Sequence, residues 1–138
     1  MLMEGVLGMK DYKKTAVLVI EDEPDIRAFA SRVLELEGCH VLQAENGEEG
    51  LRVARESKVS LVLLDLRLPG LDGWAVLEQL KSELELSSIP IIVLTASAAK
   101  LDRSRALAAG IADYIVKPVS AASLRKSVIR RLHSQGGH

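Results

Sequence analysis

Leu61-Val62-Leu63-Leu64-Asp65, near the middle of the chain, consists of four apolar residues followed directly by a carboxylate, and Arg67-Leu68-Pro69-Gly70 then turns the chain. An uninterrupted apolar run of this length predicts a strand buried on both faces of a sheet. An ionisable group at the end of such a strand is costly unless it is paired, bound to a metal or used in chemistry. We therefore interpret Asp65 as a nucleophile that the rest of the chain holds in place.

The composition indicates one globular domain with an ordinary core. The 138 residues are 48% hydrophobic and 27% charged, and the formal net charge of −1 gives no reason to expect nucleic acid or an anionic membrane as a partner. No apolar run is long enough to cross a bilayer. Cys39 is the single cysteine, which excludes an intrachain disulfide. This favours a cytoplasmic location and a buried, apolar role for Cys39.

Four more strands are predicted, with a helix after each strand. The expected strands cover residues 16–20, 40–44, 61–64, 89–94 and 113–116. Each gap between them is long enough for a crossover helix, so the alternation predicts a parallel α/β sheet with helices on both faces. The strand at 40–44 is the most polar and is expected at an edge.

Capping residues and apolar spacing predict the helices. Asn46, Asp72 and Ser120 are expected to cap three of them, and Asp72 is interpreted as a cap and not as a metal ligand. The predicted inward positions are Ile26, Phe29, Ala30 and Val33, then Val76, Leu77, Leu80 and Leu84, and finally Ala121, Leu124 and Val128. Residues 98–109 predict a marginal, alanine-rich helix. The basic residues expected on a solvated outer face are Arg125, Lys126, Arg130 and Arg131.

The domain prediction is a single unit over residues 15–133. Residues 1–14 are expected to form a flexible N-terminal arm and residues 134–138 a short tail. The Met1 start and the few residues after the last helix favour a stand-alone protein.

Ionisable and hydroxyl side chains gather at the predicted carboxyl ends of four strands. These are Glu21 and Asp22, Asp65, Thr95 and Lys117. In an open parallel sheet these ends meet at one rim, where binding sites form. Two like unit charges about 4 Å apart repel each other by roughly 4 kcal/mol at an effective dielectric constant near 20. Lys117 carries one positive charge, which does not neutralise three carboxylates. Either one carboxyl group is protonated or a divalent cation binds, and the all-oxygen ligands suit Mg²⁺, with Mn²⁺ as a substitute. The chemistry indicated is phosphoryl transfer onto Asp65.

Four motifs in order resemble the receiver domain of the two-component response regulators, over about residues 15–132. They are Val17-Leu18-Val19-Ile20-Glu21-Asp22-Glu23, Leu63-Leu64-Asp65-Leu66-Arg67-Leu68-Pro69-Gly70-Leu71-Asp72-Gly73, Val93-Leu94-Thr95-Ala96 and Asp113-Tyr114-Ile115-Val116-Lys117-Pro118. The resemblance, and not the spacing, implies a doubly wound (βα)5 flavodoxin-like fold with strand order 2-1-3-4-5.

The resemblance also implies the roles of the metal-site residues. Asp65 would accept a phosphoryl group from a histidine of a sensor kinase or a phosphotransfer protein. Asp22, Asp65 and the backbone carbonyl of Arg67 would ligate Mg²⁺, with Glu21 nearby, through water. The other acids of this region, Glu23 and Asp25, are interpreted as first-turn charges that favour the helix dipole.

Thr95 and Lys117 would contact the phosphoryl group, and Tyr114 would reposition when Thr95 moves. Phosphorylation would thereby change the surface formed by residues 98–132, which would signal to a downstream protein or pass the phosphate on. The Lys117–Pro118 bond is expected to be cis, as is frequent in this family.

Three alternatives remain. A phosphatase of the haloacid dehalogenase type would need an aspartate two residues after the nucleophile, where this chain has Arg67. A receiver that is never phosphorylated would lack the acceptor, the acidic pair or the lysine, and all are present. The chain could also be the receiver of a hybrid histidine kinase. We interpret it as a signalling switch and not as an enzyme acting on a separate substrate.

Overall fold

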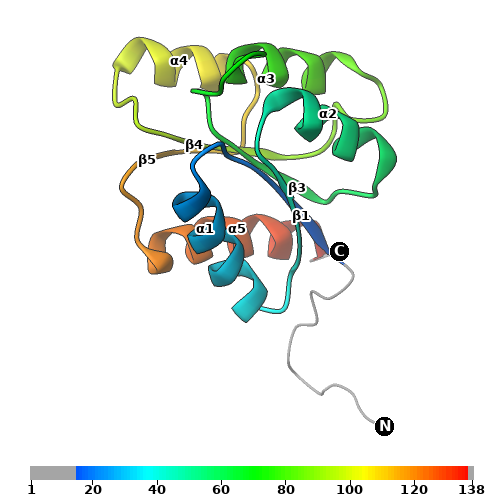
Figure 1. Cartoon of the computed structure of the whole chain (residues 1–138), viewed down its shortest axis with the longest axis vertical. Coiled ribbons are helices and arrows are strands. Elements are labelled where there is room, and N and C mark those ends of the chain that lie inside the picture. The colour runs from blue at the N-terminus through cyan, green and yellow to red at the C-terminus, as the bar shows by residue number, and fades with distance from the viewer. Residues whose placement is uncertain (1–14, 137–138) are drawn as a thin grey trace, which may run out of the picture.

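The computed structural model describes residues 15–136, which form a five-stranded parallel sheet in the order β2-β1-β3-β4-β5 (Figure 1). The strands are β1 (Ala16–Ile20), β2 (His40–Ala44), β3 (Leu61–Leu64), β4 (Ile91–Thr95) and β5 (Asp113–Val116). The helices are α1 (Pro24–Leu36), α2 (Gly47–Glu56), α3 (Gly73–Ser82), α4 (Lys100–Ala108) and α5 (Ala121–Gly136). The predicted fold class and strand order are confirmed. The predicted arm, residues 1–14, and residues 137–138 lie outside the described residues.

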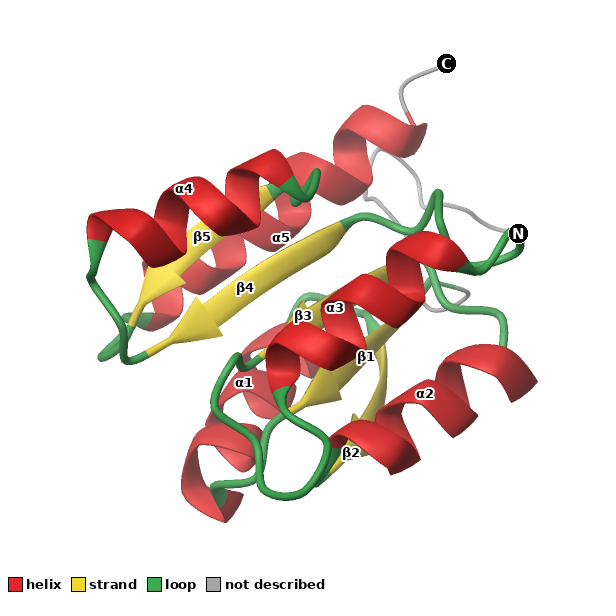
Figure 2. Ribbon diagram, turned by 90° about the horizontal axis from the view of Figure 1, so that it is seen from above, coloured by secondary structure: helices red, strands yellow, loops and turns green. Residues whose placement is uncertain are grey.

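Helices cover both faces of the sheet. Figure 2 shows α2, α3 and α4 on one face, with α1 and α5 behind the strands. Alternate residues of the central strands therefore enter two separate cores. One core contains Leu18, Ile20, Val62, Leu64, Ile91 and Val93, and the other contains Val17, Val19, Leu61, Leu63, Ile92 and Leu94. Burial on both faces explains why these strands are continuous apolar runs in the sequence.

The predicted caps of three helices are confirmed. Asn46 Oδ1 accepts the Glu49 N–H at 2.8 Å, and Asp72 Oδ1 accepts the Ala75 N–H at 2.8 Å. Ser120 Oγ accepts the Ser123 N–H at 3.0 Å. Each bond satisfies a donor that the first turn of a helix leaves without an intrahelical partner.

Two side chains that were predicted to point inward are exposed. Leu84 is 91% exposed because α3 ends at Ser82 and the next residue is extended, so the helical period does not reach it. Phe29 is 39% exposed, because the buried stripe of α1 is centred on Ala30 and Leu34 and leaves Phe29 at its margin. The bounds predicted for the fourth strand, 89–94, were wrong: β4 begins only at Ile91, after Pro90, which has no N–H to donate to the sheet, and it ends at Thr95.

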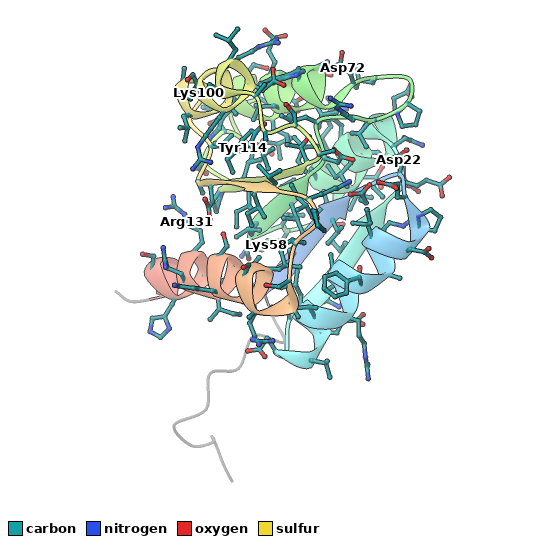
Figure 3. All side chains as sticks on the ribbon, turned by 90° about the vertical axis from the view of Figure 1, so that its left-hand side faces the viewer. Asp22, Lys58, Asp72, Lys100, Tyr114 and Arg131 are labelled. Carbon is teal, nitrogen blue, oxygen red and sulfur yellow. The ribbon has the colours of Figure 1, made fainter. Side chains whose placement is uncertain are left out.

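The helix α4 is weakly anchored, as its composition predicted. Ala106 is the one buried residue of this helix, and Leu101 and Leu107 are 84% and 51% exposed. The basic residues of α4 and α5, such as Lys100 and Arg131, lie on the outside (Figure 3). None of the helices described is long and apolar enough to span a bilayer.

Leu80 and Leu84 provide a direct test of where α3 ends. Leu80 is fully buried, so Leu80→Ala is expected to lower the free energy of unfolding by about 2–5 kcal/mol. Leu84→Ala removes an exposed side chain and is expected to change it by less than about 0.5 kcal/mol. Urea unfolding of both variants measures the difference. Equal losses would place Leu84 in the core and contradict this boundary of α3.

Candidate functional site

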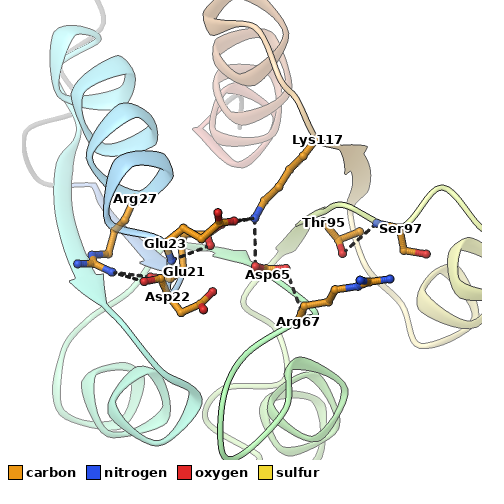
Figure 4. A network of polar contacts seen from close by, with 9 residues as sticks. All are labelled: Glu21, Asp22, Glu23, Arg27, Asp65, Arg67, Thr95, Ser97 and Lys117. Carbon is orange, nitrogen blue, oxygen red and sulfur yellow. Dashed lines mark hydrogen bonds and ion pairs between the residues drawn. The ribbon is translucent and has the colours of Figure 1, made fainter.

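The ends of β1, β3 and β5 bring carboxylates and one ammonium together (Figure 4). In the sheet Ile20 pairs with Leu64, so the residues that follow them, Glu21 and Asp65, leave adjacent strands side by side. Lys117 follows β5, and its Nζ lies 2.8 Å from Glu21 Oε1 and 3.1 Å from Asp65 Oδ2. The convergence that we expected from the strand ends is thus present in the structure.

Asp65 is held by bonds to both of its carboxylate oxygens. The Arg67 N–H donates to Oδ1 at 2.9 Å and the Lys117 ammonium donates to Oδ2 at 3.1 Å. The side chain is only 3% exposed. Gly73 allows α3 to pack tightly beneath it, because a Cβ at this position would lie 2.4 Å from the Asp65 carbonyl oxygen. The acceptor that we predicted is therefore fixed in position by backbone and side-chain contacts.

Three carboxylates at this rim form a group with the chemistry of a hard-cation site. One oxygen each of Glu21, Asp22 and Asp65 lies within 4.8 Å of the others. Glu21 Oε1 is buried, and its partner is the Lys117 ammonium at 2.8 Å, which also contacts Asp65 and Glu23. Three carboxylates beside one ammonium carry excess negative charge, which suits a divalent cation, and oxygen ligands favour Mg²⁺.

Arg27 has a role in this loop that the residue pattern does not predict. Its guanidinium donates to the carbonyl oxygens of Glu21 at 2.7 Å and Asp22 at 3.4 Å. The Glu23 N–H donates in turn to Glu21 Oε2 at 3.1 Å. These bonds fix the backbone that presents the acidic pair. An arginine in the second turn of a helix gives no sequence signal for such a contact.

Glu23 also reaches the site, although we interpreted it only as a helix-dipole charge. Its Oε1 lies 3.3 Å from Lys117 Nζ, so the lysine contacts three carboxylates. The Glu23 side chain is 59% exposed and lies at the solvent side of the cluster. The carboxylates whose oxygens lie close enough together to share a metal ion are those of Glu21, Asp22 and Asp65.

Ser97 connects the hydroxyl of Thr95 to Tyr114 and to α4. The Ser97 N–H donates to Thr95 Oγ1 at 3.4 Å, and its carbonyl accepts the Tyr114 hydroxyl at 2.8 Å. Ser97 Oγ donates to Asp102 Oδ2 at 2.6 Å, a contact that sequence analysis missed. Thr95 is fully buried and Tyr114 is 5% exposed, so the two residues predicted to switch both point inward here. The Lys117–Pro118 bond is cis.

Burial and charge shift the pKa values of two groups in the cluster. Burial raises the pKa of Glu21 to about 7, with a further contribution from the negative charge of Asp65 and against the effect of the Lys117 ammonium. Burial alone would lower the pKa of Lys117, but its bonds to Glu21 and Asp65 outweigh this, and the pKa is raised. Lys117 is therefore charged at neutral pH, whereas Glu21 is close to its midpoint.

Comparison with known proteins assigns the family. The family model described as "Response regulator receiver domain" matches residues 17–129. The chain therefore belongs to the response regulator receiver domains, as its motifs indicated. Members of this family are phosphorylatable signalling modules that bind Mg²⁺ at an acidic pocket and interact with histidine kinases or phosphotransfer proteins. In this chain the oxygens of Glu21, Asp22 and Asp65 lie close enough together that they could hold a metal ion.

Two curated relatives illustrate the range of lengths in the family. "Protein PilH" of Pseudomonas aeruginosa is 36% identical over 112 residues, which cover 81% of this chain and 93% of that protein. "Probable transcriptional regulator ycf27" of Pyropia yezoensis is 43% identical over 122 residues, which cover 86% of this chain and 49% of that protein. The chain thus spans about half the length of the ycf27 relatives and most of PilH.

Solved structures agree with the fold. A CheY-like receiver domain protein from Methanospirillum hungatei has a TM-score of 0.82 and 28% identity, covering 89% of this chain and 97% of that one. The receiver domain of a sensor histidine kinase from Pseudomonas aeruginosa has a TM-score of 0.78 and 31% identity, covering 86% of this chain and 97% of that one. The latter structure has a magnesium ion coordinated in its active site cleft.

The raised pKa of Glu21 predicts how stability depends on pH. Between the ordinary pKa of 4.5 and the folded value of about 7, the folded protein binds more protons at Glu21 than the unfolded chain. Stability therefore falls as pH rises through this window, by up to about 3 kcal/mol. Glu21→Gln removes this titration, so in EDTA the wild type should lose stability relative to the variant between pH 5 and pH 7.5. Urea unfolding at several pH values measures this, and parallel pH profiles would contradict the assignment.

Proposed function

We propose that Asp65 accepts a phosphoryl group from a phosphohistidine of a sensor histidine kinase or of a histidine phosphotransfer protein. The observation that carries this proposal is the Asp65 carboxylate itself. It lies at the end of a buried strand, bonded to Lys117 and grouped with Glu21 and Asp22. Phosphorylation of a carboxylate needs a nearby cation and a second positive charge that faces the transferred group, and these residues supply sites for both.

In the transfer step, an Asp65 carboxylate oxygen forms a bond to phosphorus while the bond between phosphorus and the histidine nitrogen breaks. The bonding electron pair stays with the imidazole nitrogen, and the product is an acyl phosphate. Lys117 leaves one of its carboxylate partners and faces the phosphoryl oxygens. Thr95 donates its hydroxyl to one of these oxygens, which requires its present contact with Ser97 to rearrange.

The proposed ligands of Mg²⁺ are Asp22, Asp65 and the backbone carbonyl of Arg67, with Glu21 acting through water. Mn²⁺ would use the same oxygen ligands. When bound, the ion supplies positive charge opposite the developing charge on the phosphoryl oxygens. The support for this set is the mutual distance of the three carboxylates and their excess negative charge, since Lys117 is the one ammonium in contact with Glu21 and Asp65 among the described residues.

The proposed output is a change in the surface formed by residues 98–132. Phosphorylation would stabilise a pre-existing arrangement in which Thr95 and Tyr114 are held inward, and thereby shift its population. The helix α4 suits this role because only Ala106 is buried, so little apolar packing opposes its movement. The partner would be a downstream protein or the next carrier of a phosphorelay. On this view the chain is a switch that is itself phosphorylated, with slow self-catalysed dephosphorylation.

Three features of the chain remain predictions. They are the domain limits at residues 15 and 133, the stand-alone state and the cytoplasmic location.

Phosphorylation at Asp65 has a direct mass test. Incubation with acetyl phosphate and Mg²⁺ is expected to add the mass of one phosphoryl group, and EDTA should prevent the addition because the metal site is then empty. Asp65→Asn should show no addition. Intact-mass spectrometry of the four reactions measures this. An addition without Mg²⁺ would contradict the metal requirement, and an addition that persists in Asp65→Asn would place the acceptor elsewhere.

The lifetime of the phosphate is expected to depend on Arg67 and Ser97. Each lies two residues beyond a site residue, and by analogy with the family both flank the path of the attacking water. Arg67→Ala combined with Ser97→Ala should change the rate of dephosphorylation several-fold, because that path is altered. The decay of the phosphorylated mass in Mg²⁺ after removal of the donor measures it. The double variant Arg32→Ala and Ser82→Ala serves as the control, because both residues are exposed and lie outside the site. An unchanged rate in the first pair would defeat this prediction.

A further inference from the structure

We infer that Glu23 is a specificity-determining residue for the phosphoryl donor. Its carboxylate stays paired with the Lys117 ammonium until a phosphoryl donor binds. Its negative charge slows phosphorylation by donors that carry two negative charges. This inference rests on the proposed phosphorylation of Asp65, and it concerns which donors phosphorylate Asp65 fastest.

The contacts of Lys117 distinguish Glu23 from the other two carboxylates. Lys117 Nζ lies 2.8 Å from Glu21, 3.1 Å from Asp65 and 3.3 Å from Glu23. The Glu21 and Asp65 side chains are 2% and 3% exposed, whereas Glu23 is 59% exposed. Glu23 is therefore the partner at the entrance, and it is the one that Lys117 gives up at the lowest desolvation cost.

The Glu23 side chain contacts Lys117 and does not cap α1. Glu23 is the N-cap residue of α1, but its side chain makes no capping hydrogen bond. Its backbone is fixed instead, because its N–H donates to Glu21 Oε2 at 3.1 Å. The side chain extends toward Lys117, as Figure 4 shows. Asp25, which is exposed in the same first turn, is absent from the ion pairs of the described residues and provides a matched control.

The consequence is an electrostatic filter at the entrance. Once Lys117 turns to the incoming phosphoryl group, Glu23 loses its counter-ion while it is close to the donor oxygens. The resulting repulsion grows with the charge of the donor, because the Coulomb energy is proportional to that charge. Glu23 is exposed, so salt screens this repulsion. Donors with a single negative charge are consequently favoured over dianions of similar size.

Two small donors separate the effect of charge. Near neutral pH, acetyl phosphate is a dianion and phosphoramidate carries a net single negative charge. In both reactions an Asp65 oxygen bonds to phosphorus; the departing acetate or ammonia keeps the electron pair of the broken P–O or P–N bond. The initial rates are measured by intact mass at saturating Mg²⁺ for the wild type, Glu23→Gln and Asp25→Asn. Glutamine preserves the size of the side chain, so the variant changes mainly its charge.

Glu23→Gln is expected to accelerate phosphorylation by acetyl phosphate roughly tenfold and by phosphoramidate roughly threefold, so the ratio of the two rates rises roughly threefold. Asp25→Asn should leave this ratio unchanged, and high salt should reduce the effect of Glu23→Gln. An unchanged ratio in Glu23→Gln, or an equal rise in Asp25→Asn, would overturn the inference while Asp65 remains the acceptor. A wild type that gains no phosphoryl group from either donor would contradict the proposed function itself, and this inference with it.

Discussion

Excess negative charge at the carboxyl edge of the sheet governs the chemistry of this protein. The parallel strands end side by side, so Glu21 and Asp65 lie close together and Asp22 lies within reach of both. Lys117 is the only ammonium that contacts Glu21 and Asp65 in the described part of the chain, and one positive charge does not balance three carboxylates. The molecule resolves this in two ways. Burial and the negative charge of Asp65 raise the pKa of Glu21 to about 7, and the oxygens of Glu21, Asp22 and Asp65 are close enough that they could hold a divalent cation.

The rest of the fold divides into a part that holds this charge and a part that responds to it. The central strands β1, β3 and β4 are buried on both faces, so the backbone that carries Asp65 has little freedom. The contacts of the helix α4 with the rest of the fold include the bond between Ser97 and Asp102, and Ala106 is its one buried residue. A change at the rigid edge can therefore move α4 without unfolding the core.

The sequence predicted those features that follow from periodicity and strand ends. The five strands, their order through the family resemblance, the helix caps and the convergence around Asp65 all depend on such patterns. The errors concern positions where the chain leaves a regular period. Leu84 lies beyond the end of α3, and Phe29 lies at the margin of a buried stripe. The contacts of Glu23 and Arg27 were missed because they depend on the path of the β1–α1 loop, which a residue pattern does not specify.

The most direct test of the charge account is the affinity of the metal-free protein for Mg²⁺, measured by isothermal titration calorimetry. If Lys117 competes with the cation for the same carboxylates, Lys117→Met should bind Mg²⁺ about tenfold more tightly than the wild type. Asp22→Asn, which removes a ligand charge, should bind it about tenfold more weakly. Equal affinities in all three proteins would contradict the account, because they would show that the cation and Lys117 do not share these carboxylates.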